Sequence, residues 1–142
     1  MKQTIETSIE INAPPEKVWE VLSATDAYPD WNPFIRSIAG RLEQGKTIKV
    51  SLSLPGGGSF GFKPLILKAS FPEIRWKGKF LLGGLFDGEH YFRVESVSPN
   101  ITRFLHGEHL SGVLVGLLRG ALEKTKRGFQ LMNGALKKIA ER

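Results

Sequence analysis

The segment LLRGALEKTKRGFQLMNGALKKIAER, residues 117–142, decides the fold of this chain. When these residues are placed at 100° intervals from Leu117, the apolar and small side chains share one arc of about 140°. They are Leu118, Ala121, Leu122, Thr125, Gly128, Phe129, Met132, Ala135, Leu136, Ile139 and Ala140. Charged and polar residues fill the remaining arc, with Leu131 as the main exception. The pattern predicts one amphipathic helix, roughly 36 Å long at 1.5 Å per residue.

This segment also carries most of the positive charge of the chain. The formal net charge is +6, and residues 119–142 contain seven basic and two acidic side chains. A concentrated basic surface can bind nucleic acid or an anionic membrane. The basic residues are not interleaved with exposed aromatic ones, as a surface for single-stranded nucleic acid requires. We therefore interpret them as the solvated outer face of a docked helix and expect no nucleic-acid partner.

The chain before this helix begins with a strand and two short helices. Residues 3–11, QTIETSIEI, alternate between apolar and polar side chains, which is typical of a half-buried strand. Residues 12–22, NAPPEKVWEVL, combine prolines that suit a helix start with apolar residues at helical spacing. Residues 26–35, DAYPDWNPFI, indicate a second short helical turn held by aromatic side chains.

From residue 36 to residue 110 the apolar pattern has the period of a β-strand. The strand segments include TIKVSLSL (47–54), PLILKASF (64–71), EIRWKGKFLL (73–82), FDGEHYFRVESV (86–97) and NITRFLHGEHL (100–110). PGGGSFG (55–61) is predicted to be a flexible hairpin tip. The sequence thus predicts one α+β domain over residues 1–142. A curved antiparallel sheet of about seven strands has the long C-terminal helix packed across it. One helix cannot fill the concave side of such a sheet, so we expect a cavity there.

Composition excludes several classes of protein. The chain contains no cysteine, so it forms no disulfide or thiolate metal site, and this suits a reducing cytoplasm. Its first twenty residues contain no unbroken apolar segment of the kind found in signal peptides. No apolar run approaches the roughly 20 residues that span a bilayer. We expect a cytoplasmic protein without stable membrane insertion.

The stretch FLHGEHL, residues 104–110, places polar side chains within an otherwise apolar strand face. Alternation puts His106 and Glu108 on the same face as Phe104 and Leu110, and puts His109 on the other. Alternation in the two preceding strands predicts the same inward direction for other residues. These are His90 and Phe92 in residues 86–97, and Trp76 and Phe80 in residues 73–82. The predicted ligand pocket is lined by Trp76, Phe80, His90, Phe92, Phe104, His106, Glu108, Leu110, Leu118, Leu122, Phe129 and Met132.

Three roles are open for the inward-facing polar residues His90, His106 and Glu108. A His–Glu pair can be purely structural, because each group satisfies the other's hydrogen bonds. The residues can also orient a ligand, or act as a general acid and base, for which all three are candidates. A metal site is not indicated, because His106 and His109 lie on opposite strand faces, and nothing in the sequence indicates a cofactor. Trp31 and Phe34 either mark the pocket entrance or simply cap the sheet.

Two parts of the chain resemble a known superfamily. INAPPEKVWEVLSATDAYPDWNPFI (11–35) and HGEHLSGVLVGLLRGALEKTKRGFQLMNGALK (106–137) are similar to the START-like superfamily, SRPBCC, with the helix-grip fold. The resemblance is to its bacterial polyketide cyclase/dehydrase and lipid-transport group. It covers essentially the whole chain and implies a hydrophobic pocket between the sheet and the C-terminal helix.

These observations leave three functions to distinguish. The first is binding of a small hydrophobic or amphipathic ligand, lipid-like or polyketide-like, in the interior cavity. The second is an enzyme of the polyketide aromatase/cyclase or dehydratase type that uses the pocket histidines and glutamate. The third is a protein-interaction module like the co-chaperone activators of the superfamily, acting through the basic face around Lys137 and Lys138.

Overall fold

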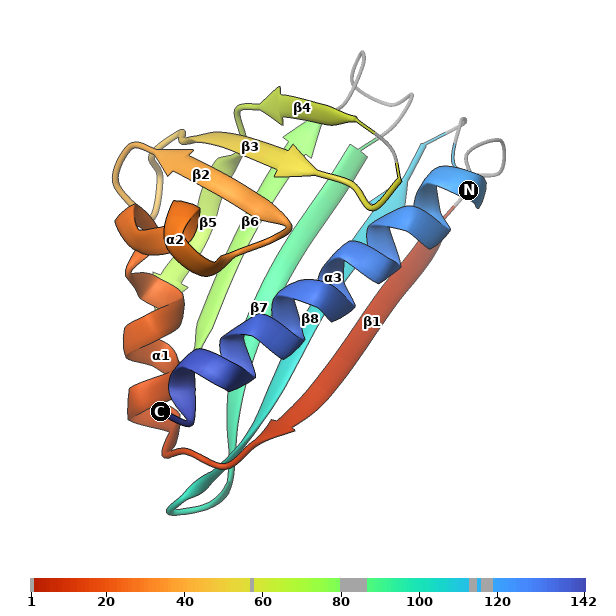
Figure 1. The fold of residues 1–142 in the computed structure, drawn as a ribbon. Coiled ribbons are helices and arrows are strands. Elements are labelled where there is room, and N and C mark those ends of the chain that lie inside the picture. The colour runs from red at the N-terminus through yellow and green to blue at the C-terminus, as the bar shows by residue number, and fades with distance from the viewer. Residues whose placement is uncertain (1, 57, 80–86, 113–114, 116–118) are drawn as a thin grey trace.

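A computed structural model describes residues 2–56, 58–79, 87–112, 115 and 119–142. The first half of the chain forms β1 (Lys2–Ile11), α1 (Pro15–Ser23), the 3-10 turn η1 (Thr25–Ala27), α2 (Tyr28–Trp31), β2 (Ile35–Ala39), β3 (Lys49–Ser53) and β4 (Ser59–Phe62). The second half forms β5 (Leu65–Ser70), β6 (Glu73–Lys79), β7 (Asp87–Ser98), β8 (Ile101–Ser111) and α3 (Arg119–Ala140). The predicted order of elements is confirmed, with two short helices after the first strand and one long helix at the end (Figure 1).

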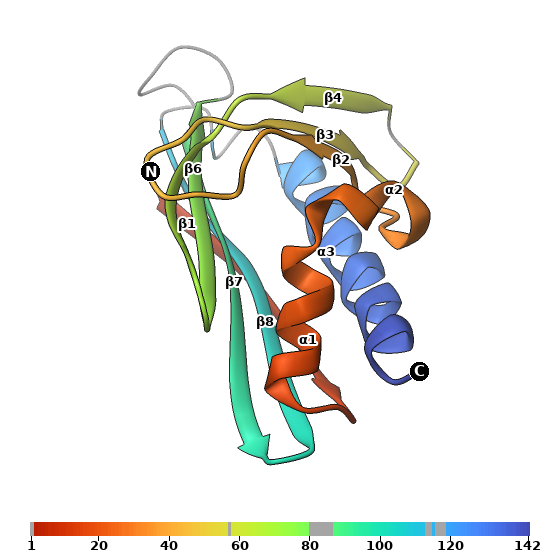
Figure 2. The ribbon, with the colours of Figure 1, turned by 90° about the vertical axis from the view of Figure 1, so that its left-hand side faces the viewer.

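The strands form two antiparallel sheets in the part of the chain that the structure describes. Five strands pair in the order β1-β8-β7-β6-β5, and the other three pair in the order β2-β3-β4. Figures 1 and 2 show α1 and α3 on one face of the large sheet, with the small sheet lying across the same side at one end. The predicted α+β fold is confirmed, with one strand more than the seven segments expected and with the described strands divided between two sheets. The additional strand is β4, which begins inside the segment expected to be a hairpin tip, because Phe60 and Phe62 alternate across Gly61 and pair with β3.

The register of the large sheet brings the inward-facing residues into rows. Trp76 pairs with His90 and His90 pairs with Glu108, so these three residues cross β6, β7 and β8 in one row. In the next row, His106 lies between Phe92 on β7 and Thr7 on β1. Alternation along each strand predicted this inward orientation, and the burial of all three polar residues confirms it.

Helix α3 packs across the large sheet through its apolar face. Phe129, Met132 and Leu136 are completely buried, whereas Leu131, the exception on the helical wheel, is 50% exposed. Gly128 is required by close packing. A Cβ atom at this position would lie 2.4 Å from Cδ1 of Phe34, so only glycine allows this approach of helix and ring.

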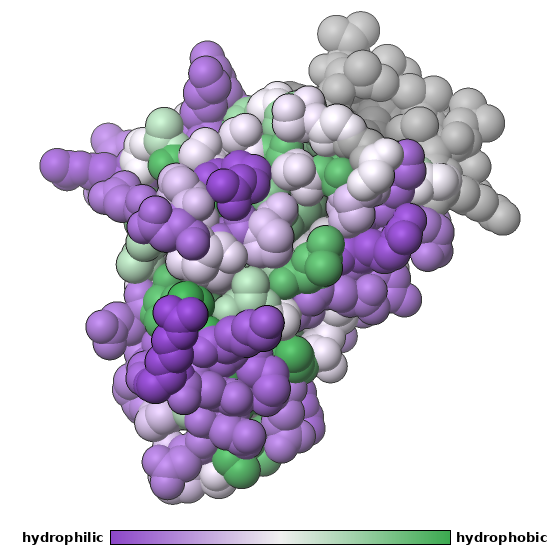
Figure 3. Space-filling model, in the orientation of Figure 1, coloured by the Kyte–Doolittle hydropathy of each residue, from purple (hydrophilic) through white to green (hydrophobic). Residues whose placement is uncertain are grey.

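The C-terminal end of α3 is tied to the end of β1. Lys137 Nζ donates a hydrogen bond to the Glu10 carbonyl at 2.8 Å and pairs with Glu141 at 2.6 Å. Glu141 in turn accepts a hydrogen bond from the Asn12 backbone N–H at 2.8 Å. Figure 3 shows largely hydrophilic side chains over the outer side of this helix, as its charge pattern predicted. None of the helices that the structure describes is long and apolar enough to cross a membrane.

Candidate functional site

A cavity of about 110 Å³ lies between the two sheets and the first half of α3. Its described lining consists of Phe34, Leu52, Leu54, Phe60, Phe62, Trp76, His90, Glu108, Leu110, Ala121, Leu122 and Thr125. The lining is mainly apolar, with His90 and Glu108 as its ionisable members. Five residues of the predicted ligand pocket lie here, namely Trp76, His90, Glu108, Leu110 and Leu122, together with Phe34 of the predicted entrance.

Several other predicted pocket residues form solid core beneath the cavity. Phe92, Phe104, His106, Phe129 and Met132 have no exposed surface and are absent from the described cavity lining. The four rings among them pack on one another, and His106 stacks on Phe129 with a centroid separation of 4.0 Å. The interior therefore divides into a packed part and a hollow part along α3.

The remaining predicted positions lie elsewhere. Phe80 and Leu118 fall outside the residues that the structure describes. Trp31 is half-buried on α2, where its ring meets Tyr28 edge-on at 5.2 Å, and it does not contribute to the described cavity lining.

A groove of about 460 Å³ adjoins the cavity at the protein surface. Leu54, Phe60 and Ala121 line both spaces, so the cavity and the groove meet between the β3–β4 hairpin and the start of α3. Lys124 is the charged side chain among the groove residues that the structure describes. Apolar side chains are visible at the seam between the small sheet and α3 in Figure 3.

The size of the cavity limits what it can enclose. A volume of about 110 Å³ is slightly below the roughly 150 Å³ of an apolar cavity that binds benzene, and equals three to four water molecules. Pockets that enclose drug-sized ligands measure about 300–1,000 Å³. A whole lipid or multi-ring polyketide therefore does not fit inside the cavity in this conformation, and a single ring is the upper limit.

A chain of hydrogen bonds runs from the cavity wall into the core. His90 Nε2 lies 2.8 Å from His106 Nε2, and His106 Nδ1 lies 3.0 Å from Asn133 Oδ1. Asn133 Nδ2 donates to Thr7 Oγ1 at 2.8 Å, and Thr7 Oγ1 donates to the His106 carbonyl at 2.9 Å. These bonds connect β7, β8, α3 and β1 through four side chains.

The chain of hydrogen bonds fixes the tautomers of both histidines. Because Asn133 uses its amide N–H toward Thr7, its oxygen accepts the Nδ1 proton of His106. The Nε2 atom of neutral His106 is then an acceptor, and it receives the Nε2 proton of His90. His90 consequently presents an unprotonated Nδ1 toward Glu108, whose Oε1 lies 4.0 Å away.

Burial sets the protonation states of these groups. It raises the pKa of Glu108 to about 8 and lowers the pKa of His106 to about 3, the latter against a weaker opposing effect of the Asn133 hydrogen bond. The pKa of His90 lies well below its usual value because of burial and then because of His106. At neutral pH the carboxyl is therefore mainly protonated and both imidazoles are neutral.

Trp76 contributes its ring to the cavity wall. Its ring stacks on His90 with a centroid separation of 5.1 Å. The side chain is only 2% exposed, yet Nε1 has no hydrogen-bond partner among the described residues. A buried donor without an acceptor is unusual, because it has lost its bonds to water without replacing them.

Sequence reasoning missed Asn133, which supplies the partner of His106. A self-sufficient His–Glu pair was one of the roles left open by the sequence, but His106 bonds instead to His90 and to this amide. On the helical wheel of α3, Asn133 falls at about 160°, just beyond the apolar arc. A lone amide at the margin of an apolar stripe was the available signal.

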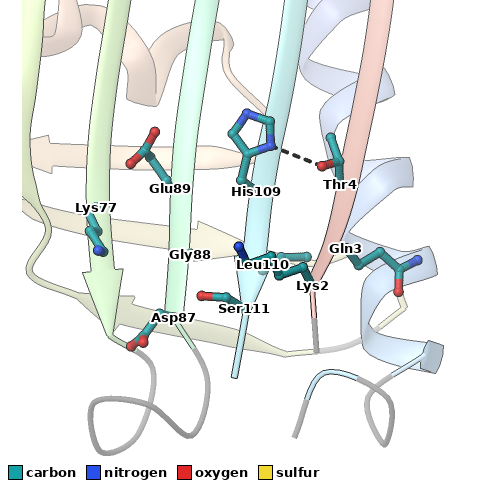
Figure 4. A pocket seen from close by; sticks show the side chains of 10 residues that line it. All are labelled: Lys2, Gln3, Thr4, Lys77, Asp87, Gly88, Glu89, His109, Leu110 and Ser111. Carbon is teal, nitrogen blue, oxygen red and sulfur yellow. Dashed lines mark hydrogen bonds between the residues drawn. The ribbon is translucent and has the colours of Figure 1, made fainter. Parts of the chain in front are cut away.

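A different space of about 320 Å³ lies on the opposite face of the large sheet (Figure 4). Its lining carries charges of both signs, including Lys2, Lys77, Asp87 and Glu89. His109 points to this face, as alternation predicted, and its Nδ1 lies 3.0 Å from Thr4 Oγ1. The mixed charges and exposed side chains are typical of a solvated sheet face. Among the residues that the structure describes, no group of three His, Cys, Asp or Glu side chains could hold a metal ion.

Comparison with known proteins places this geometry in a family. The family model described as polyketide cyclase / dehydrase and lipid transport matches residues 2–141. The chain belongs to this family. The match extends over nearly the whole α+β domain, in agreement with the helix-grip resemblance of its sequence.

Several solved structures have the same fold as this member of the polyketide cyclase/dehydrase and lipid transport family. The Zhui aromatase/cyclase from Streptomyces sp. R1128 is 16% identical, with a TM-score of 0.80 over 100% of this chain and 95% of that one. A START superfamily protein from Mycobacterium smegmatis is 17% identical, with a TM-score of 0.71 over 96% and 98%. Norcoclaurine synthase from Thalictrum flavum, in complex with dopamine and hydroxybenzaldehyde, is 14% identical, with a TM-score of 0.72 over 98% and 86%. A search of curated proteins finds no match.

Proposed function

We propose that the protein binds a small hydrophobic or amphipathic molecule in the cavity between its sheets and α3. The observation that carries this proposal is an apolar cavity in which two polar side chains, Glu108 and His90, lie side by side on one wall. That combination is typical of sites that bury a ligand and fix its orientation.

The dimensions of the site indicate how such a ligand lies. A single ring or short apolar chain occupies the cavity of about 110 Å³, and the rest of the molecule extends into the adjoining groove past Phe60. Lys124 there is available to a polar or anionic end. The complex of norcoclaurine synthase with dopamine and hydroxybenzaldehyde supports this size class, because both of its ligands are built on one ring.

A cavity-filling substitution tests the proposal. Leu122→Trp should block the cavity, because the larger side chain occupies the space that Leu122 now borders. Leu131→Trp is the matched control, since Leu131 lies on the same helix with half its surface in solvent. Calorimetric titration with ethylbenzene should show binding to the wild type and to Leu131→Trp, but not to Leu122→Trp. Equal binding by all three proteins would refute the proposed site. Native mass spectrometry of the purified wild type should reveal any molecule that it carries from the cell.

A second function is favoured by one specific feature of the same site. Glu108 is a protonated acid and His90 is a neutral base, and the two atoms that face each other lie 4.0 Å apart. An acid and a base side by side can supply and remove protons in a cyclase-like or dehydratase-like reaction. In that case Glu108→Gln should reduce kcat strongly and leave substrate affinity nearly unchanged, which separates catalysis from binding.

A further inference from the structure

The hydrogen bonds around the cavity leave one donor on its wall unused. His106, Asn133 and Thr7 satisfy one another, and His90 spends its only N–H proton on His106. One donor that borders the cavity remains, the protonated carboxyl of Glu108, because Nε1 of Trp76 is unpaired but has no accessible surface. The nearest acceptor described for Glu108 is His90 Nδ1 at 4.0 Å, which is beyond hydrogen-bond length.

We propose that the cavity selects a neutral ring compound that carries a carbonyl oxygen, with Glu108 donating a hydrogen bond to that oxygen. This inference rests on the proposed binding function and names its ligand class. A carbonyl oxygen has two lone pairs and no proton, so it complements a wall that offers a donor. A hydrocarbon would leave the Glu108 donor unpaired, which is costly in a buried site.

The surroundings of Glu108 disfavour an anionic ligand. His90 faces it from β7, His106 lies beyond on β8, and both imidazoles are neutral. The described parts of β3, β4, β6 and α3 that line the cavity contribute apolar side chains, Trp76 and Thr125, without a charge. Ile5 lies opposite Glu108 on β1, and Lys124 lies in the groove outside. A carboxylate placed in the cavity would therefore find no positive charge within the described lining.

The same arrangement makes recognition of a ketone depend on pH. Burial raises the pKa of Glu108 to about 8, so the carboxyl keeps its proton at pH 6.5 and loses it above pH 8. Ionisation removes the donor and places a negative charge beside the carbonyl oxygen. Ketone binding should therefore weaken as the pH rises through about 8.

Titration of the wild type with three probes, followed by NMR of the indole N–H protons, tests the inference. The probes are acetophenone, ethylbenzene and benzoate, which share one benzene ring and differ in the attached group. The chain has three tryptophans, and Trp76→Phe identifies the resonance of interest, while those of Trp19 and Trp31 serve as internal references. At pH 6.5, acetophenone should bind about tenfold more tightly than ethylbenzene, and benzoate should not bind. Both ligands that bind should shift the Trp76 resonance, because the side chain of Trp76 lines the cavity. Glu108→Gln retains a donor in its amide, so it should bind acetophenone equally at pH 6.5 and 9.

The outcomes separate the ligand class from the binding function. If acetophenone and ethylbenzene bind equally in the cavity, or if benzoate binds more tightly than either, the protein is a ligand binder and the inference about the carbonyl is overturned. If neither acetophenone nor ethylbenzene binds, the proposed function fails and this inference fails with it. If the wild type binds acetophenone equally at pH 6.5 and pH 9, Glu108 does not donate a hydrogen bond to the ligand. This test uses only the wild type, so it does not depend on whether Trp76→Phe folds.

Discussion

Replacing Glu108 by glutamine should abolish a large dependence of folding stability on pH. Glu108 is 6% exposed, and burial raises the pKa of its carboxyl from 4.5 to about 8. Between these two values the folded chain keeps the proton while the unfolded chain releases it. Raising the pH through this window therefore favours the unfolded chain, and the wild type loses stability. Glutamine has the same shape but does not ionise, so this loss is absent from the variant.

The magnitude follows from the two pKa values. A difference of about 3.5 between them corresponds to about 5 kcal/mol over the whole window, at 1.36 kcal/mol for each pH unit. Between pH 5 and pH 9 the contribution is about 4 kcal/mol, because part of the change lies below pH 5. The buried histidines act in the opposite sense, since their lowered pKa values make the fold less stable as the pH falls below 6.5. They are present in both proteins and cancel in the comparison.

Urea unfolding at several pH values measures this difference. The free energy of unfolding of the wild type, relative to Glu108→Gln, should fall by about 4 kcal/mol from pH 5 to pH 9. Glu123→Gln serves as the control, because Glu123 is exposed on α3. If the wild type and Glu108→Gln give parallel curves over this range, Glu108 is not a buried neutral acid. The ligand class inferred from it is then wrong as well.

Two further substitutions test the packing that shapes the cavity. Asn133→Leu should lower the free energy of unfolding by about 1–3 kcal/mol, because it leaves the Nδ1–H donor of His106 unpaired, whereas Gln130→Ala on the exposed face of α3 should have little effect. Urea unfolding that finds these two variants equally stable would contradict the role of the hydrogen-bond chain. Gly128→Ala should destabilise the fold despite the better helix propensity of alanine, because the new Cβ would lie 2.4 Å from Phe34. Gly134→Ala on the same helix meets nothing within 4 Å and should be neutral or more stable by up to about 1 kcal/mol, and thermal unfolding that ranks the pair in reverse would contradict this account of Gly128.

Local periodicity was sufficient to predict which way most side chains point. Alternation along β7 and β8 turned His90, His106 and Glu108 inward and His109 outward, and burial confirms each direction. The wheel of residues 117–142 likewise predicted α3 and its exposed Leu131. These features depend only on the fixed geometry of a strand or a helix, so a single sequence contains them.

The depth of each inward residue could not be predicted in this way. His90 and His106 both point inward, yet His90 borders the cavity and His106 lies in solid core. The difference depends on where α3 crosses the sheet and how closely it approaches. Gly128 against Phe34 brings the middle of the helix close, and the cavity lies nearer to its start. Long-range packing of this kind has no periodic signature in the sequence.

The partners of buried polar groups were also beyond local reasoning. Asn133 lies 27 positions from His106 along the chain and 126 from Thr7, so only the docked helix brings them together. The sequence predicted that buried histidines need partners, and the nearest carboxyl, Glu108, was the natural candidate. The structure assigns the role to an amide instead, which leaves Glu108 at the cavity wall with its proton available.

A crystal structure of the protein soaked with acetophenone at pH 6.5 tests the central claim most directly. We predict electron density for the ring between Trp76 and Leu122, with the carbonyl oxygen within hydrogen-bond distance of the Glu108 carboxyl. Density for the ring on the outer face of the large sheet, with the interior cavity filled by ordered water, would contradict it.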